Sequence, residues 1–269
     1  MNKVPGKVIS ADCLSLSMAP KRSLSQVALD LIFPQSCPSC HHQHRGGWKE
    51  GLVCRRCSDQ LNPIITARCQ VCGEPFPDSR NNSRFQCSNC DNRDLAFDFA
   101  TSQYHNRGVA RDMIHRLKYQ RELWLRNPLG RMIAEAIEKD ERIGNLANTV
   151  LVPVPADPTR HRERGFNQAQ EIAAVAGKLL GLPVFKLLIR LFPTPRQTNL
   201  GRSERLINLE GAFAPARGIF APSLTKIVGS TVILVDDVLT TGATAHHATL
   251  GILQVSKPNR VIIATATRA

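Results

Sequence analysis

The sequence has few aromatic side chains and no long hydrophobic segment. Aromatic residues make up 5% of its 269 residues. The longest unbroken run of Val, Leu and Ile is Val232 to Val235, whereas a membrane-spanning helix needs roughly 18 apolar residues. These scarcities argue against an integral membrane protein. The hydrophobic content of 42% in turn argues against a mostly disordered chain.

Acidic residues are also scarce. Asp and Glu number 22 against 35 Lys and Arg, which gives a formal net charge of +13. If eight cysteines bind two zinc ions as thiolates, each site carries a charge of −2, and the net charge falls to roughly +9. The chain stays basic, so we expect anionic partners.

Eight of the nine cysteines occur in four C-x-x-C pairs, while Cys13 stands alone. The pairs are Cys37/Cys40, Cys54/Cys57, Cys69/Cys72 and Cys87/Cys90. This repeated spacing is typical of zinc sites, because each pair directs two sulfurs to one point. Sequential pairing predicts two structural four-cysteine Zn²⁺ sites, the first made by 37–57 and the second by 69–90. Interleaved pairing stays open.

Two other interpretations of the cysteines are weaker. A disulfide framework needs a secreted chain, but residues 1–22 lack the sustained apolar stretch of a signal peptide. The segment from Cys37 to His41 reads C-x-x-C-H, the attachment motif of c-type haem, but haem attachment would leave Cys54 and Cys57 without a role. We therefore expect reduced thiolates and a cytoplasmic protein.

The chain divides into three parts by composition. Residues 1–22 lack periodicity and predict a disordered tail, within which Met18 is an alternative start to Met1. Residues 23–95 predict a double zinc ribbon preceded by a short helix that Ser23 caps. Residues 96–269 predict an α/β domain.

Apolar residues recur at strand and helix spacing throughout the α/β part. The expected elements are a strand at 96–104, a helix through 109–117, a helix that starts with Asn127 as N-cap and Pro128 as first residue, a strand at 149–154, a helix at 169–182, a strand at 231–235, a helix at 243–255 and a strand at 261–266. Strands that alternate with amphipathic helices indicate a parallel sheet with both faces covered.

The segment 232–244 carries the clearest chemical signal. An apolar strand runs into Asp236 and Asp237, and a Thr-Thr-Gly-Ala-Thr turn then opens a helix. Carboxylates accept hydrogen bonds from a sugar diol, and backbone N–H groups at a helix start bind phosphate. The segment lacks the G-K-[ST] of a Walker A loop. Ligands of α/β sheets bind at the carboxyl ends of strands, where this turn lies.

Residues 232–244 resemble the phosphoribosyl pyrophosphate (PRPP) motif of type I phosphoribosyltransferases. Three further blocks resemble the ComF/GntX family of competence-type proteins, whose N-terminal zinc module the four C-x-x-C pairs also match. They are I-H-R-L-K-Y at 114–119, V-P-V-P at 152–155 with R-E-R-G-F-N-Q at 162–168, and T-x-x-Q-x-x-L-x(4)-R-x-x-N-x-x-G-A-F at 194–213. The resemblance covers residues 33–269 and implies a type I phosphoribosyltransferase-like parallel sheet flanked by helices.

The resemblance also implies roles for particular residues. Asp236 and Asp237 would bind the ribose hydroxyls of PRPP. The 5′-phosphate would bind Thr240, Thr241, Gly242, Ala243 and Thr244. The pyrophosphate, which carries Mg²⁺, would bind Pro155, Arg162, Arg164, Arg202 and Lys118. The sequence identifies no catalytic residue.

Three functions remain open from the sequence. The first is a PRPP-binding protein of DNA uptake or of the use of DNA as a nutrient, which contacts single-stranded DNA or the proteins of uptake and recombination. The second is an active phosphoribosyltransferase with an unidentified acceptor. The third is a PRPP-sensing adaptor whose zinc ribbons bind another protein.

Overall fold

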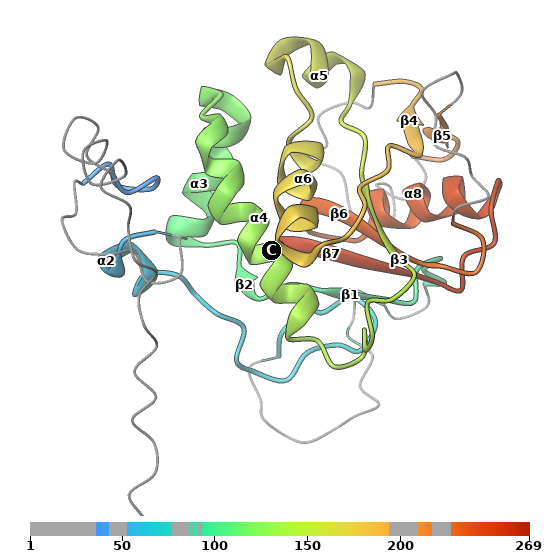
Figure 1. Cartoon of the computed structure of the whole chain (residues 1–269), viewed down its shortest axis with the longest axis horizontal. Coiled ribbons are helices and arrows are strands. Elements are labelled where there is room, and N and C mark those ends of the chain that lie inside the picture. Colours follow the sequence, from blue (N-terminus) through green and yellow to red (C-terminus); the bar gives the residue numbers. More distant parts are fainter. Residues whose placement is uncertain are drawn as a thin grey trace, which may run out of the picture. The chain divides into compact units, whose positions relative to one another are not determined.

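The computed structural model describes residues 36–42, 53–76, 87, 89–90, 93–193, 209–216 and 227–269 (Figure 1). These described residues belong to one compact unit. The predicted tail at 1–22, the helix expected after Ser23, Cys13 and Arg202 lie outside the described residues. The boundary between zinc ribbon and α/β domain at residue 95 stays a prediction.

A five-stranded parallel sheet forms the centre of this unit. Its order is β1 (Phe99–Thr101), β7 (Arg260–Arg268), β6 (Thr231–Leu239) and β3 (Thr149–Pro153), and β2 (Tyr104–His105) also pairs with β7. Thr231 is the register partner of both Thr149 and Arg260. The three adjacent strands β3, β6 and β7 therefore start level, and their carboxyl ends lie at the same edge of the sheet.

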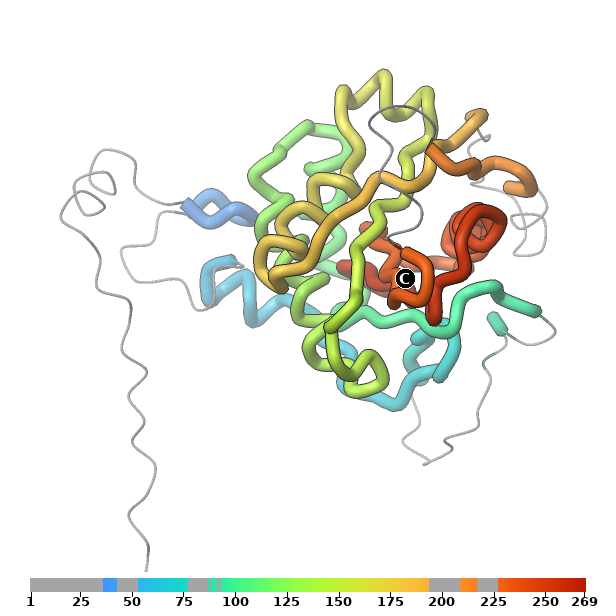
Figure 2. Tube along the Cα trace, turned by 45° about the vertical axis from the view of Figure 1, so that its right-hand side comes forward, coloured from blue at the N-terminus to red at the C-terminus, as the bar shows by residue number. Residues whose placement is uncertain are grey.

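Helices and a small two-stranded sheet cover the two faces of the central sheet (Figures 1 and 2). On one face lie α3 (Gly108–Gln120), η1 (Leu123–Leu125), α4 (Arg126–Glu138) and α6 (Gln168–Leu180); on the other lie α8 (Ala243–Leu253) and the antiparallel pair β4 (Leu188–Arg190) and β5 (Phe213–Pro215). Along β6, Ile233 and Val235 pack toward the first group, and Val232 and Leu234 toward the second. This period of two is the pattern of a strand buried on both faces.

Two further short helices lie within the described part of the chain. They are α2 (Arg55–Ser58), within the cysteine-rich part, and α5 (Pro158–Arg164), between β3 and α6. Asp157 caps α5 by accepting hydrogen bonds from the N–H groups of Thr159 and Arg160. The predicted parallel sheet with flanking helices is thereby confirmed. Among the described residues, no helix is both long and apolar enough to cross a membrane.

Several predicted boundaries were wrong. The segment expected as one strand at 96–104 pairs with β7 only at 99–101 and 104–105, and the strand expected at 261–266 runs from 260 to 268. The strand expected to end at Val235 continues as β6 to Leu239, because β7 extends to Arg268 and offers backbone partners along this length. The second helix begins at Arg126, so Asn127 is not its N-cap. The 3₁₀ turn of η1 leads directly into α4, and Pro128 is tolerated there because N–H groups of the first turn have no intrahelical acceptor.

Candidate functional site

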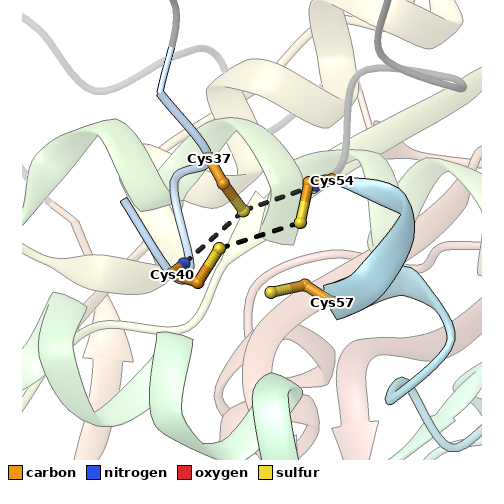
Figure 3. Close-up of side chains that lie close together, drawn as sticks. All are labelled: Cys37, Cys40, Cys54 and Cys57. Atoms are coloured by element: carbon orange, nitrogen blue, oxygen red, sulfur yellow. Dashed lines mark hydrogen bonds between the residues drawn. The ribbon is translucent and has the colours of Figure 1, made fainter. Parts of the chain in front are cut away.

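The first group of cysteines forms a compact cluster of four sulfurs. Cys37, Cys40, Cys54 and Cys57 place their Sγ atoms within 4.8 Å of one another, and Figure 3 shows the side chains converging from two segments of chain. The Sγ atoms of Cys40 and Cys54 lie 3.7 Å apart. Four sulfurs at 2.3 Å around a tetrahedral zinc ion lie about 3.8 Å apart. The cluster therefore fits zinc.

The second group, Cys69, Cys72, Cys87 and Cys90, has the same arrangement and is fully buried. Its Sγ–Sγ distances are 3.9 Å between Cys69 and Cys90 and 3.3 Å between Cys72 and Cys87. The two clusters confirm sequential pairing. Because all four ligands of each site come from the protein, the sites are structural in type.

The surroundings of these cysteines shift their thiol pKa values in different directions. Burial would raise the pKa of Cys37, but the backbone N–H groups of Cys54, Cys40 and Ser39 lower it to about 7. Burial and the neighbouring sulfur of Cys72 raise the pKa of Cys87 to about 11. Zinc binding must therefore displace protons, which weakens zinc affinity as the pH falls.

A cavity of about 190 Å³ lies at the carboxyl ends of β3 and β6. Its lining brings together most of the residues singled out by the sequence. The lining residues are Lys118, Tyr119, Val154, Pro155, Ala156, Asp157, Arg160, Arg164, Gln168, Arg190, Asp236, Asp237, Val238, Thr240 and Thr244. Four of them are basic and three are acidic, so the cavity suits a ligand that carries both hydroxyl groups and negative charge.

Asp237 is 3% exposed and has partners on both carboxylate oxygens. Lys118 of α3 forms an ion pair with Oδ2, and Gln168 of α6 donates its amide N–H to Oδ1 at 3.3 Å. Arg164 in turn donates to the Gln168 amide oxygen at 3.0 Å. Burial alone would raise the pKa of Asp237, but Lys118 and Gln168 hold it below its ordinary value. Asp237 is thus a fixed anion.

The pKa of Asp236 is shifted in the opposite direction from that of Asp237. Side chains alternate along a strand, so Asp236 lies on the opposite side of β6 from Asp237, and its Oδ1 accepts a hydrogen bond from the Asp237 backbone N–H at 2.9 Å. Burial first, and then the charge of Asp237, raise the pKa of Asp236, and Lys118 offsets this only in part. A ligand that donates hydrogen bonds to Asp236 would stabilise its charged form.

The turn after β6 has the backbone that phosphate binding requires. Gly242 adopts a φ of 79°, in the left-handed region that favours glycine, and forms the N-cap of α8 without a side-chain hydrogen bond. The N–H groups of the first turn of α8 therefore point toward the end of the strand. Thr240 and Thr244 line the cavity, and the Thr241 hydroxyl accepts from the Ala243 N–H at 3.5 Å.

The predicted pyrophosphate residues are only partly brought together. Pro155, Arg164 and Lys118 line the cavity. Arg162 instead lines a neighbouring cavity of about 380 Å³, which shares Pro155, Ala156 and Arg190 with the first. Residues 160 and 164 lie four apart on α5 and face one cavity together, whereas residue 162 is rotated away from them.

Sequence reasoning missed several lining residues. Gln168 is the last residue of the R-E-R-G-F-N-Q block, so the motif included it. Its hydrogen bond to Asp237, however, depends on the packing of α6 against β6. Arg190 ends β4 and pairs with Asp157 at 3.8 Å. No local pattern marks Arg190, because it reaches the cavity only through the tertiary fold.

Similarities to known proteins agree with this arrangement. Residues 28–92 match the double zinc ribbon domain family. The chain is 28% identical to Competence protein F of Haemophilus influenzae over 201 residues, which cover 74% of this chain and 82% of that protein. It is 27% identical to Competence protein ComFC of Bacillus subtilis over 223 residues, covering 81% and 84% of the two chains.

A third relative matches only part of the chain. It is Bifunctional protein PyrR of Chloroflexus aurantiacus, 34% identical over 135 residues, which cover 49% of this chain and 63% of that protein. With the observed sheet and the two cysteine clusters, these similarities confirm a type I phosphoribosyltransferase-like fold with an N-terminal zinc-ribbon module.

The cysteine clusters predict the zinc content of the purified protein. Two zinc ions per chain are expected, because two complete four-sulfur sites are present. Cys90→Ser should reduce the content to about one, because three thiolates hold structural zinc poorly. Cys13→Ser serves as the control and should retain two. Elemental analysis after gel filtration checks this, and equal zinc loss in both variants would contradict the assignment.

The unequal acids predict a pH-dependent stability. Because the pKa of Asp236 is raised above its ordinary value of 3.8 in the fold, the folded chain binds more protons than the unfolded chain above that pH. The Asp236 contribution to the free energy of unfolding therefore falls as the pH rises from 3.8 to about 8, the raised pKa of Asp236 in the fold. Asp236→Asn should lose this dependence and be more stable than wild type at the alkaline end.

Urea unfolding at a series of pH values measures the effect. Asp112→Asn, which alters an exposed acid of α3, is the matched control and should follow the wild-type profile. If Asp236→Asn also follows that profile, the carboxyl of Asp236 is not strained by its surroundings.

Proposed function

The chain belongs to the family of Competence protein F and ComFC, and on that premise we propose that its cavity at 236–244 binds PRPP. The observation that carries the proposal is the meeting of two unlike carboxylates with a glycine-capped helix start at one strand end. A ribose 5-phosphate needs this combination, because its diol donates hydrogen bonds and its phosphate accepts them.

The ribose binds to the carboxylates in this proposal. Asp236 accepts hydrogen bonds from the two ring hydroxyls, which favours its charged form at neutral pH. Asp237 is held by Lys118 and Gln168 and fixes the end of β6. The 5′-phosphate then binds the N–H groups and hydroxyls of 240–244, as the motif resemblance implies.

The pyrophosphate binds on the basic side of the cavity. Lys118, Arg160, Arg164 and Arg190 line this region, and backbone N–H groups follow Pro155. PRPP carries about four or five negative charges when its phosphates are ionised, and Mg²⁺ bound to the pyrophosphate offsets two of them. The charge that remains is still negative, so it is attracted to the basic side chains on this side of the cavity.

The same cavity would also serve a transferase. Displacement of pyrophosphate from ribose C1 passes through an oxocarbenium-like state, which the Asp236 carboxylate would stabilise electrostatically. The arginines would hold the leaving pyrophosphate in place. Pyrophosphate release that depends on an added acceptor would identify a transferase, whereas saturable binding without release would identify a PRPP-binding regulator or adaptor.

A surface next to the cavity suits single-stranded DNA. Arg111, His115 and Tyr119 lie four residues apart on α3 and are all exposed. Tyr119 is 59% exposed and Trp124 of η1 is 51% exposed. Bases stack on such aromatic rings, while arginine neutralises phosphates. We place DNA contact here, in a cytoplasmic protein of DNA uptake that also meets proteins of uptake or recombination.

Calorimetric titration with PRPP and Mg²⁺ tests the sugar-phosphate site. Zinc-loaded wild type is expected to bind with micromolar affinity, and Asp236→Asn and Asp237→Asn at least about tenfold more weakly, because each removes a charge-assisted acceptor or its support. Asp112→Asn is the control and should bind like wild type. No binding to the folded wild type would contradict the proposal.

Fluorescence anisotropy with a labelled oligothymidylate tests the DNA surface. Trp124→Ala should weaken binding by about 1–3 kcal/mol, the contribution of one stacked base. Arg111→Ala should reduce the slope of log affinity against log salt by about one. Lys178→Ala, which removes an exposed charge from α6, should change neither quantity. A Trp124→Ala variant that binds like wild type would place DNA elsewhere.

A further inference from the structure

Arg268 of β7 connects the second zinc site to the end of β6. Its side chain is deeply buried, with the residue 2% exposed. Nε donates to the carbonyl oxygen of Cys72 at 3.1 Å, and Nη2 lies 3.7 Å from the Cys72 Sγ and pairs with Glu74. Nη1 donates to the carbonyl oxygen of Leu239 at 3.0 Å. One guanidinium thus joins a zinc-ligating cysteine to the last residue of β6.

Leu239 immediately precedes the turn at 240–244. Its carbonyl also accepts from the Ala269 N–H at 2.9 Å, so both lone pairs are used and its position is fixed. The segment after Cys90 contacts the far side of the turn. A Cβ on Gly242 would lie 3.6 Å from the Phe97 ring, and the Ala96 N–H donates to the His246 ring at 3.0 Å.

Arg116 makes a comparable connection from the first zinc site. It donates to the carbonyl oxygens of Pro38, at 3.2 Å, and Ser39, which lie between the ligands Cys37 and Cys40. Figure 2 shows this segment, in blue, beside the green helix α3. Two residues further along the same helix, Lys118 pairs with Asp237. A shift of α3 therefore moves the partner of a cavity carboxylate.

We propose that Arg268 and Arg116 are positioning residues that couple zinc occupancy to sugar-phosphate binding. The inference rests on the proposed function, because it concerns the same cavity. The metal supplies most of the folding energy of such small ribbons. Without it, the turns that carry the Cys72 and Ser39 carbonyls lose their shape, and both guanidinium groups lose acceptors that hold β6 and α3 in place.

Coupling of this kind must be reciprocal. If zinc strengthens PRPP binding, PRPP must strengthen zinc binding by the same factor. Changes in affinity appear mostly in the dissociation rate. The readout, which needs no enzymatic activity, is therefore the rate of zinc release to excess 4-(2-pyridylazo)resorcinol, followed by absorbance. Saturating PRPP with Mg²⁺ should slow release from wild type at least about fivefold, the lower range of typical couplings. Asp237→Asn, measured at the same PRPP concentration, is the control for zinc that PRPP itself binds in solution.

Arg142 offers a matched control for Arg268. It donates to the carbonyl oxygen of Gln70, between Cys69 and Cys72, at 2.7 Å. Its other contacts are with Asp140, Ala100 and the Phe99 ring, none of which lines the cavity. Both Arg142→Met and Arg268→Met should release zinc faster than wild type. PRPP should still slow release from Arg142→Met, but should no longer do so from the second site of Arg268→Met. Arg116→Met should lose protection at the first site.

The outcomes separate the two claims. Failure of PRPP to bind zinc-loaded wild type overturns the proposed function and this inference with it. Binding of PRPP with unchanged zinc release overturns the inference alone. Equal protection of Arg268→Met and Arg142→Met overturns the role of Arg268. If Arg268→Met does not fold, the comparison of wild type with and without PRPP still decides whether the coupling exists.

Discussion

The ion pair between Lys118 and Asp237 is the contact that the site depends on most. A buried carboxylate without a partner costs several kcal/mol, and Asp237 is 3% exposed. Its partners come from two helices, Lys118 from α3 and Gln168 from α6. Both helices must therefore pack on the same face of the sheet before β6 can bury a charged residue near its carboxyl end. The apolar residues that share this face, including Met113, Ile172 and Val235, provide that packing.

The two adjacent carboxyl groups, Asp236 and Asp237, have different roles at the end of β6. Asp237 is a stable anion that fixes the strand end, while burial and the Asp237 charge make ionisation of Asp236 unfavourable. A site of this kind carries a cost in the free protein that a hydroxyl-donating ligand relieves, and such local conflicts are typical of functional positions. The zinc ribbons fit the same account, because Arg116 and Arg268 connect them to the elements on either side of the acids.

Local chemistry explains which features the sequence could predict. The C-x-x-C spacing is itself the geometry of a zinc turn, so both four-sulfur clusters followed from it, and the apolar run at 232–235 predicted a buried strand. The extension of β6 to Leu239 depends on pairing with β7, and Asn127 lost its expected cap position to a 3₁₀ turn; neither is a local property. Arg190 and Gln168 reach the cavity through packing. By contrast, the separation of Arg162 from Arg164 was readable, since residues two apart lie on different sides of a helix.

A crystal structure of the zinc-loaded chain with PRPP and Mg²⁺ would test the central claim most directly. The account predicts ribose hydroxyls on Asp236, the 5′-phosphate on the N–H groups of 240–244, and the pyrophosphate beside Arg160 and Arg164. It also predicts that Lys118 remains close to Asp237. Density for PRPP at another surface, or a 236–244 segment that stays empty at saturating ligand, would contradict it.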